Sequence, residues 1–405
     1  MTTNKSNNTL KLLNLKELFN EDKDLFKEIV QSALQEILEA EMNETINANK
    51  NERISCRIGY RCGYYTRDLI TRVGKIELRV PRDREGLFST EIFNRYQRSE
   101  KALVSTLMEM YINGVSTRKI SRVTEELCGH SFSAGTISNL NKTLDEQLNE
   151  FSNRKLEESY PYLFLDASYY KVRENGIVQN RAVLKALGVN WEGRRQILAI
   201  ELSNRETKSG WKDFIIRLKE RGLNGVEFVV SDNHEGLKNA ISETLPQAIW
   251  QRCYVHFLRN ALDYLPRKKQ VDDVLLELRW IYERINLNES KRALKLWLTK
   301  WNNKYSKLCE WVEENIEETL SFYHLPRQHR KNMKSTNVLE RLNEEMKRRT
   351  YVLRIFPNPD SCLRLLRALA VEIQEFWIER NRYLNMDFLR EHKKYSDNKS
   401  LDMTA

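Results

Sequence analysis

The feature that most constrains this fold is a series of short apolar runs separated by helical patterns. Five β-like runs occupy 162–172, 182–189, 196–202, 226–231 and 248–253. Helical periodicity fills 210–221 and 235–245. Apolar runs of this length are typical of buried strands. Three strands in succession, followed by helix, strand, helix and strand, predict an α/β domain.

Two of these runs carry an aspartate at or near the carboxyl end, and a glutamate follows much later on a basic helix. Asp166 lies in YLFLDAS, Asp232 ends VEFVVSD, and Glu340 lies in VLERLNEEMKRR. Three carboxylates from distant parts of a chain can hold two divalent cations about 3.5–4 Å apart, which supports in-line phosphodiester displacement. The carboxyl ends of strands are also where α/β sheets place their sites.

Each acid also has a purely structural interpretation. Asp166 could cap the turn after its strand, and Asp232 opens a segment with good helix N-cap chemistry. Glu340 lies close to Glu344 and Glu345, and ordinary ion pairs on a surface helix are the favoured interpretation of that segment taken alone.

Side-chain periodicity assigns each acid to a face. Along the first strand, a period of two puts Asp166 on one face with Phe164 and Ser168, and puts Leu163 and Leu165 on the other. An acid in so apolar a run is costly to bury unless a cation or a hydrogen-bond donor compensates it.

The helix that carries Glu340 is also basic. Glu340 shares a face with Asn343, Glu344 and Lys347, at intervals of three, four and seven residues. Its basic end suits phosphate binding. We therefore predict phosphate contacts from Lys347, Arg348 and Arg349.

The surplus of basic residues is compatible with a partner rich in phosphate. The 405 residues include 67 Lys and Arg against 57 Asp and Glu, a net charge of +10. Such a surplus either solvates a surface or binds nucleic acid, where each neutralised phosphate releases counterions. Six scattered cysteines fit a reducing compartment. Without a signal peptide or an apolar run of about 18 residues, the protein is expected to be soluble and cytoplasmic.

The N-terminal region predicts a helix followed by a basic hairpin. After a loose tail, amphipathic periodicity indicates a helix over 24–46, and alternation over 69–80 indicates a hairpin that turns at Gly74 and stops at Pro81. Basic residues on this hairpin are candidates to lie along a DNA backbone, although a solvated basic edge is a common device against aggregation. These candidates are Arg72, Arg79 and Arg82.

Helical patterns between 103 and 148 suggest a helix-turn-helix. One helix ends near Gly114, a second starts at Ser116 and buries Ile120, Val123 and Leu127, and a third opens at Ser133 and buries Ile137, Leu140 and Leu144. In such a motif the second helix enters the major groove, but many helical domains show the same pattern without binding anything. The predicted DNA contacts are Arg118, Lys119, Thr136, Asn139 and Lys142.

The remaining segments complete the predicted organisation. Residues 268–325 are helical throughout, with tryptophans among their apolar positions, and predict an insertion before the helix of Glu340. Cys253 and His256 are two of the four ligands that a zinc site normally needs, so a buried thiol hydrogen-bonded to a histidine is preferred. The predicted segments are 1–50 (tail and helix), 51–155 (DNA-binding), 156–265 (core, first part), 266–330 (helical insertion), 331–390 (core, second part) and 391–405 (tail).

Four further segments carry a family resemblance over nearly the whole chain. They are TRVGKIEL with VPRDR, MYINGVSTRKI, VVSDNHEGL and QRCYVHFLRN. With these, the chain resembles the bacterial insertion-sequence transposases of the Mutator-like family. Two departures are Asn233, where many relatives carry Gly, and Cys62, where the family often has Asn. Neither touches the three acids.

The resemblance implies a DDE-type transposase. It implies a ribonuclease H-like α/β core interrupted by an all-α insertion, with a mainly α-helical DNA-binding region before it. The family's acids fall on Asp166, Asp232 and Glu340, and its Cys-x-x-His element falls on Cys253 and His256. It further implies two Mg²⁺ or Mn²⁺ ions, binding of double-stranded DNA at terminal inverted repeats and target, a homodimer or larger assembly, and a circular intermediate.

Two alternatives stay open on the sequence. An inactive DNA-binding copy would keep the fold and the charge without the chemistry. A structure-selective nuclease on the same fold would cut DNA without joining it.

Overall fold

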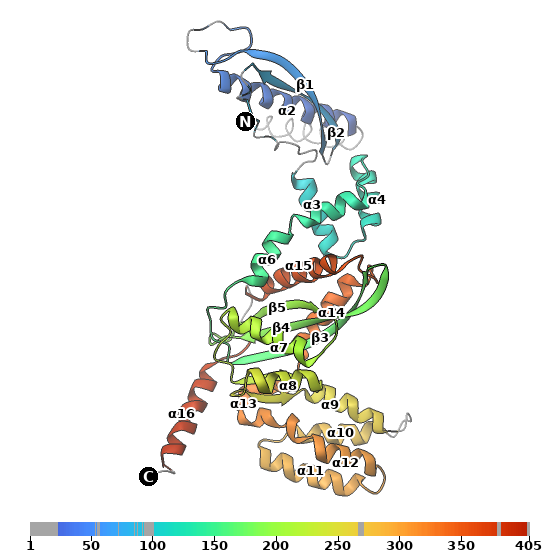
Figure 1. The fold of residues 1–405 in the computed structure, drawn as a ribbon, viewed down its shortest axis with the longest axis vertical. Coiled ribbons are helices and arrows are strands. Elements are labelled where there is room, and N and C mark those ends of the chain that lie inside the picture. Colours follow the sequence, from blue (N-terminus) through green and yellow to red (C-terminus); the bar gives the residue numbers. More distant parts are fainter. Residues whose placement is uncertain are drawn as a thin grey trace, which may run out of the picture. The chain divides into compact units, whose positions relative to one another are not determined.

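The computed structural model describes residues 23–402, except 53, 55–56, 72, 85, 87, 91, 93–100, 266–270 and 379–381. The chain divides into two compact units, Met1–Thr143 and Leu144–Ala405. Figure 1 labels most of the helices and strands of both units.

The first unit begins with a helix packed on a hairpin, as predicted. Helix α2 spans Lys23–Ile46, and strands β1 (Arg61–Thr71) and β2 (Gly74–Asp83) pair antiparallel. Gln35 of α2 also hydrogen-bonds the backbone of Arg79, with its side chain both donating and accepting. Apolar side chains of the helix and both strands form a shared core of Leu38, Leu69, Ile76, Leu78 and Val80.

The prediction that Pro81 ends the hairpin is wrong. Strand β2 continues to Asp83, and Pro81 pairs with Tyr64 of β1. A proline cannot donate a ladder hydrogen bond, but it is tolerated on edge strands. In a two-stranded sheet both strands are edge strands, so the alternating pattern decides the length of β2.

Three short helices follow in the same unit, and the second and third begin where the sequence predicts. They are α3 (Lys101–Ile112), α4 (Thr117–Cys128) and α5 (Ala134–Lys142). Ser116 and Ser133 each accept a hydrogen bond from a first-turn backbone N–H, and Gly129 ends α4 in a left-handed conformation. These caps fix both helix starts.

The predicted buried face of α4 and the extent of the third helix need correction. Leu127 is 67% exposed, and α4 instead buries Ile120, Thr124 and Cys128, four residues apart. The third helix ends at Lys142, and a separate helix, α6 (Asp145–Asn153), follows. The tighter i, i+4 row faces the neighbouring helices, so the apolar character of Leu127 does not decide its burial.

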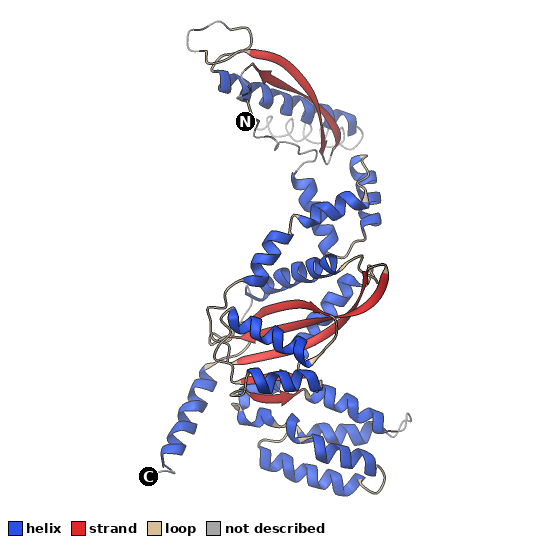
Figure 2. Cartoon of the chain, in the orientation of Figure 1, coloured by secondary structure: helices blue, strands red, loops and turns tan. Residues whose placement is uncertain are grey.

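The second unit is built on one mixed sheet (Figure 2). Its strands are β3 (Tyr162–Glu174), β4 (Ile177–Val189), β5 (Arg195–Ser203), β6 (Phe228–Ser231) and β7 (Ile249–Arg252). They lie in the order β5-β4-β3-β6-β7, with β3, β4 and β5 antiparallel and β3, β6 and β7 parallel. All five predicted strands are confirmed. β4 starts five residues before its predicted position, because Asn175 and Gly176 both adopt positive φ and close a tight hairpin with β3.

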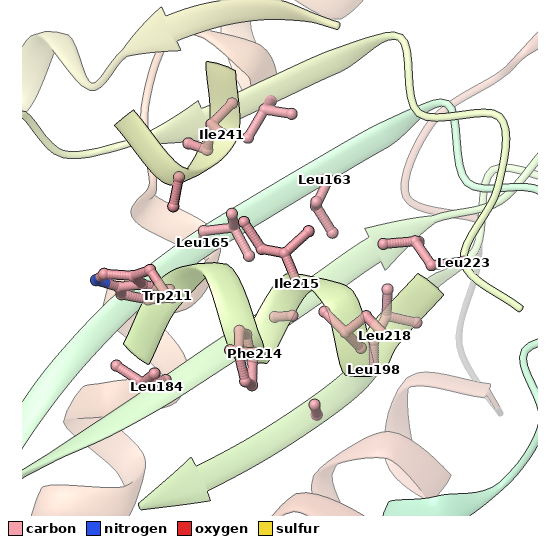
Figure 3. Packing of buried hydrophobic residues seen from close by; sticks show 14 of the residues in the cluster. Leu163, Leu165, Leu184, Leu198, Trp211, Phe214, Ile215, Leu218, Leu223 and Ile241 are labelled. Carbon is pink, nitrogen blue, oxygen red and sulfur yellow. The ribbon is translucent and has the colours of Figure 1, made fainter. Parts of the chain in front are cut away.

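Two helices cover one face of this sheet. Helices α7 (Lys208–Glu220) and α8 (Glu235–Thr244) bury their apolar sides against it. Figure 3 shows the leucines of the strands with four side chains of α7: Trp211, Phe214, Ile215 and Leu218. Leu163 and Leu165 belong to this core, as the period of two predicts.

The opposite face of the sheet carries Asp166 and meets two later helices. Helix α14 (Asn337–Thr350) contacts β3, and α15 (Pro359–Ile378) contacts β3 and β5. The segment between β7 and α14 is mostly helical. Its helices are α9 (Tyr254–Ala261), α10 (Val271–Ile281), α11 (Leu287–Trp301), α12 (Ser306–Asn315) and α13 (Arg327–Met333). Short 3-10 turns join them at Leu262–Tyr264, Glu317–Thr319 and Ser321–His324. Helix α16 (Asp387–Asp402) comes last. Across the described residues, no helix combines the length and the apolar character that a membrane span requires.

Candidate active site

Strand register brings the two aspartates together. β3 and β6 are adjacent parallel strands, and Phe164 pairs with Val230. Asp166 and Asp232 each lie two residues further along, and paired strands are about 4.8 Å apart. The two carboxylates therefore meet at the carboxyl end of the parallel part of the sheet.

Asp166 is held in a buried position by an amide from α14. Its side chain is 6% exposed, and Asn343 Nδ2 donates a hydrogen bond of 2.5 Å to its Oδ2. Burial, reinforced by the charge of Asp232, raises the pKa of Asp166, while Lys185 and Asn343 oppose that rise. A carboxylate so placed gains from any further cation.

Two side-chain oxygens at this site have no hydrogen-bond partner among the described residues. Within the described part of the chain, Asp232 Oδ1 and Asn343 Oδ1 are both buried and find no hydrogen-bond donor. Buried oxygens are normally satisfied. These two are therefore free to accept a ligand from outside the chain.

Glu340 comes to the same region from α14. Its Oε1 lies 3.4 Å from His256 Nε2 and 3.7 Å from an Arg259 guanidinium nitrogen, both on α9. The interpretation of Glu340 as one member of an intrahelical ion pair on α14 does not match these contacts. The intrahelical pairs of that helix involve Glu345 instead, which binds Arg348 and Arg349.

Cys253 and His256 form a pair that supports Glu340. Cys253 is fully buried, and its Sγ accepts hydrogen bonds of 3.4 Å from both the N–H and the hydroxyl of Thr336. Interaction with Cys253 raises the pKa of His256 to about 9 against the effect of burial, with help from the charges of Asp232 and Glu340. His256 also favours the ionised form of Asp166. The imidazolium thus interacts electrostatically with all three acids.

Two charged residues at this site escaped the sequence-based prediction. Lys185 pairs with Asp166 across β3 and β4, is 0% exposed and donates a hydrogen bond to Ser168. Glu206, just before α7, is hydrogen-bonded to Tyr169, and burial together with the charge of Asp232 raises its pKa. A lysine inside the apolar run RAVLKALGV was a usable signal. Glu206 had none, because it lies in a polar loop.

We expect Lys185 to make stability depend on alkaline pH. Burial lowers the pKa of Lys185 to about 8, below its value of 10.5 in the unfolded chain. The unfolded state therefore binds more protons between these values, and stability should rise with pH there. Between pH 7.5 and 10 the free energy of unfolding of the wild type should gain about 2 kcal/mol relative to Lys185→Met. Urea denaturation at both pH values tests this, and equal pH dependence of the two proteins would contradict it.

The side chains at this site supply some of the ligands that a divalent cation needs. In the described part of the chain, no three histidine, cysteine or acidic side chains lie close enough together to hold a metal ion. Asp166 and Asp232 nevertheless supply the oxygen ligands that Mg²⁺ prefers, and Asp232 Oδ1 is unsatisfied. These two carboxylates fit such an ion, and Glu340 contacts His256 on α9.

The residues predicted to bind DNA have different environments. In the first unit all but one of them are exposed: Arg79, Arg82, Arg118, Lys119, Thr136, Asn139 and Lys142. Arg72 lies outside the described residues. On α14, Lys347 is exposed and Arg348 pairs with Glu345. Arg349 is largely buried between Glu345 and Glu372. The assignment of these side chains to DNA contacts stays a prediction.

The fold and the site together define a class of protein. This is a mixed α/β protein in which an aspartate within β3 and an aspartate just after β6 come together across two adjacent parallel strands, and His256 links this region to Glu340. Oxygen ligands gathered in this way suit chemistry on phosphate esters.

Comparison with known proteins identifies the family. The family described as "Transposase, Mutator family" matches residues 1–380. The chain is 62% identical over 380 residues to the transposase for insertion sequence element ISRM5 of Rhizobium meliloti (strain 1021), covering 94% of this chain and 95% of that protein. It is 41% identical over 335 residues to the transposase for insertion sequence element IS256 in transposon Tn4001 of Staphylococcus aureus, covering 82% and 85%. A transposase for insertion sequence element IS1081 of Mycobacterium tuberculosis is 38% identical over 336 residues, covering 82% and 80%. The chain belongs to the Mutator family of transposases.

Proposed function

We propose that this transposase binds the terminal inverted repeats of an insertion sequence and catalyses strand cleavage and strand transfer through Asp166, Asp232 and Glu340. The observation that carries the proposal is the register of β3 and β6, because it brings two aspartates together in a chain of this family. Three antiparallel strands followed by two parallel ones support a ribonuclease H-like core. We assign that core to 156–265 and 331–390, with 266–330 as its helical insertion.

The chain's own residues have distinct tasks in this proposal. Asn343 orients the Asp166 carboxylate through its amide hydrogen bond. His256 orients Glu340 and offsets the charge that three acids accumulate. Two divalent cations, Mg²⁺ or Mn²⁺, bound by the three acids would activate the attacking oxygen and stabilise the leaving oxygen. Burial of Asp166 keeps water from competing for its oxygens.

DNA recognition is assigned to the region 51–155. Its exposed basic hairpin and the α4–α5 pair supply side chains that can reach phosphates and base edges. Two element ends must be processed together, so we propose a homodimer or larger assembly acting at the bacterial nucleoid.

A strand-joining assay tests this function against its two alternatives. Purified protein is given a labelled element end, a target duplex and Mg²⁺, and the products are separated on a denaturing gel. We expect a joined product from the wild type and none from Glu340→Gln or in the presence of EDTA. Fragments without joined product would indicate a nuclease. DNA binding without any cleavage would indicate an inactive copy.

A further inference from the structure

A basic groove lies between the insertion and the helix that carries Glu340. Its volume is about 420 Å³, and it is bordered by the end of α10, by α13 and by the connection into α14. Five cations and one carboxylate line it, above the aromatic rings of Tyr254, Tyr282 and Phe322. The charged residues are Glu283, Arg284, Arg327, Arg330, Lys331 and Lys334.

Two of these cations are held rigidly by the protein. Arg330 donates hydrogen bonds to the backbone carbonyls of Leu325, Ile285 and Tyr323, at 2.7–3.1 Å. Lys334 is 8% exposed, lies over the Tyr254 ring at 5.0 Å and pairs with Glu283 at 2.7 Å. The wall of the groove therefore keeps its charge in a fixed position, which lowers the entropic cost of binding an anion.

The other three cations are available to a ligand. Arg284, Arg327 and Lys331 are exposed. None of these three side chains has an acidic partner within the part of the chain that the structure describes. A surface that places three unpaired cations around a groove attracts a polyanion.

The groove lies next to the first turn of α14, which carries Glu340. The N–H of Tyr254, the residue after Cys253, donates to the carbonyl of Lys334 at 3.0 Å. Asn337, which lines the groove, lies three residues before Glu340 on α14. One turn of helix rises about 5.4 Å. A ligand in the groove is thus about one helical turn from Glu340.

We propose that this groove binds the sugar-phosphate backbone of the DNA strand that presents its phosphodiester to Asp166, Asp232 and Glu340. The gathering of fixed and exposed cations in a groove next to the first turn of α14 carries the inference. It deepens the proposed function and rests on it. Arg330 and Lys334 would set the path of the strand, and Arg284, Arg327 and Lys331 would neutralise successive phosphates.

The salt dependence of DNA binding tests the proposal. Arg327→Ala/Lys331→Ala removes two exposed cations of α13, and Lys295→Ala/Lys307→Ala removes two exposed cations of α11 and α12 that do not line the groove. Affinity for an element-end duplex is measured without Mg²⁺ by fluorescence anisotropy from 50 to 200 mM salt, concentrations chosen for sensitivity to phosphate contacts. For the groove variant, the slope of log affinity against log salt should become less negative by about 2, and binding should weaken about tenfold. The control variant should match the wild type.

Neutral phosphates locate the contact on the DNA. Methylphosphonates next to the cleavage point should weaken binding of the wild type and have little further effect on the groove variant, because the same contact is already lost. Equal weakening of both proteins, or a salt slope equal to that of the control, would overturn the proposal. Arg284→Ala/Arg327→Ala provides a second test if the first variant has a reduced melting temperature.

Failure of this proposal can be separated from failure of the proposed function. If the wild type joins strands and the groove variant binds and joins equally well, the proposed role of the groove is excluded and the proposed function is kept. A wild type that binds the duplex but does not cleave it with Mg²⁺ would exclude the proposed function.

Discussion

Asp166→Asn is expected to lower the rate of strand cleavage by about a thousandfold, which corresponds to about 4 kcal/mol of transition-state stabilisation. The substitution keeps the shape of the side chain, and an asparagine can still accept the hydrogen bond from Asn343. It removes the charge with which Asp166 would hold a cation on β3. Single-turnover cleavage of a labelled element end with Mg²⁺ measures the effect.

DNA affinity separates this chemical effect from misfolding. The variant should bind the element end at least as tightly as the wild type, because a negative charge next to the DNA is lost. Asp213→Asn makes the same charge change at an exposed position on α7 and should cleave normally. Cleavage by Asp166→Asn at the wild-type rate, or a parallel loss of DNA binding, would contradict the assignment of Asp166.

Gly193→Ala is expected to destabilise the second unit by more than about 3 kcal/mol. Gly193 lies between β4 and β5 with φ +78, and its carbonyl accepts hydrogen bonds from the N–H groups of Tyr383 and Leu384. A Cβ at this position would lie 1.7 Å from the carbonyl oxygen of Leu384. Backbone cannot move aside as a flexible side chain can, so the segment before α16 should detach. Urea denaturation gives the free energy of unfolding.

Gly176 offers a matched control for the cost of placing an alanine in a left-handed backbone conformation. It also has positive φ, at +81, but a Cβ there would meet no atom within 4 Å. Gly176→Ala should therefore cost only the left-handed conformation, about 1–2 kcal/mol. If both variants lose the same stability, the close approach to Leu384 contributes nothing and the prediction fails.

Local periodicity allowed most of the elements to be predicted. All five strands of the sheet, the helix over 24–46 and the caps at Ser116 and Ser133 were identifiable, because apolar spacing and capping residues act over a few positions. The predictions were wrong where contacts with other elements determined the strand length or the burial of a side chain. Pro81 stays in a strand because it occupies an edge, and Leu127 is exposed because the other face of α4 meets the adjacent helices.

At the candidate site, too, local sequence patterns predicted some features and tertiary contacts decided the others. The sequence by itself determined that Asp166 and Asp232 lie at two strands of one α/β domain and that Asp166 faces away from the leucine core, since these follow from apolar spacing and a period of two. Only the tertiary structure decided that Asn343 binds Asp166 across 177 residues of sequence and that Thr336 binds Cys253 across 83. It also decided that Lys185 is buried opposite Asp166. Such contacts depend on how helices dock on the sheet, and docking is set by the packing of whole surfaces rather than by any local pattern.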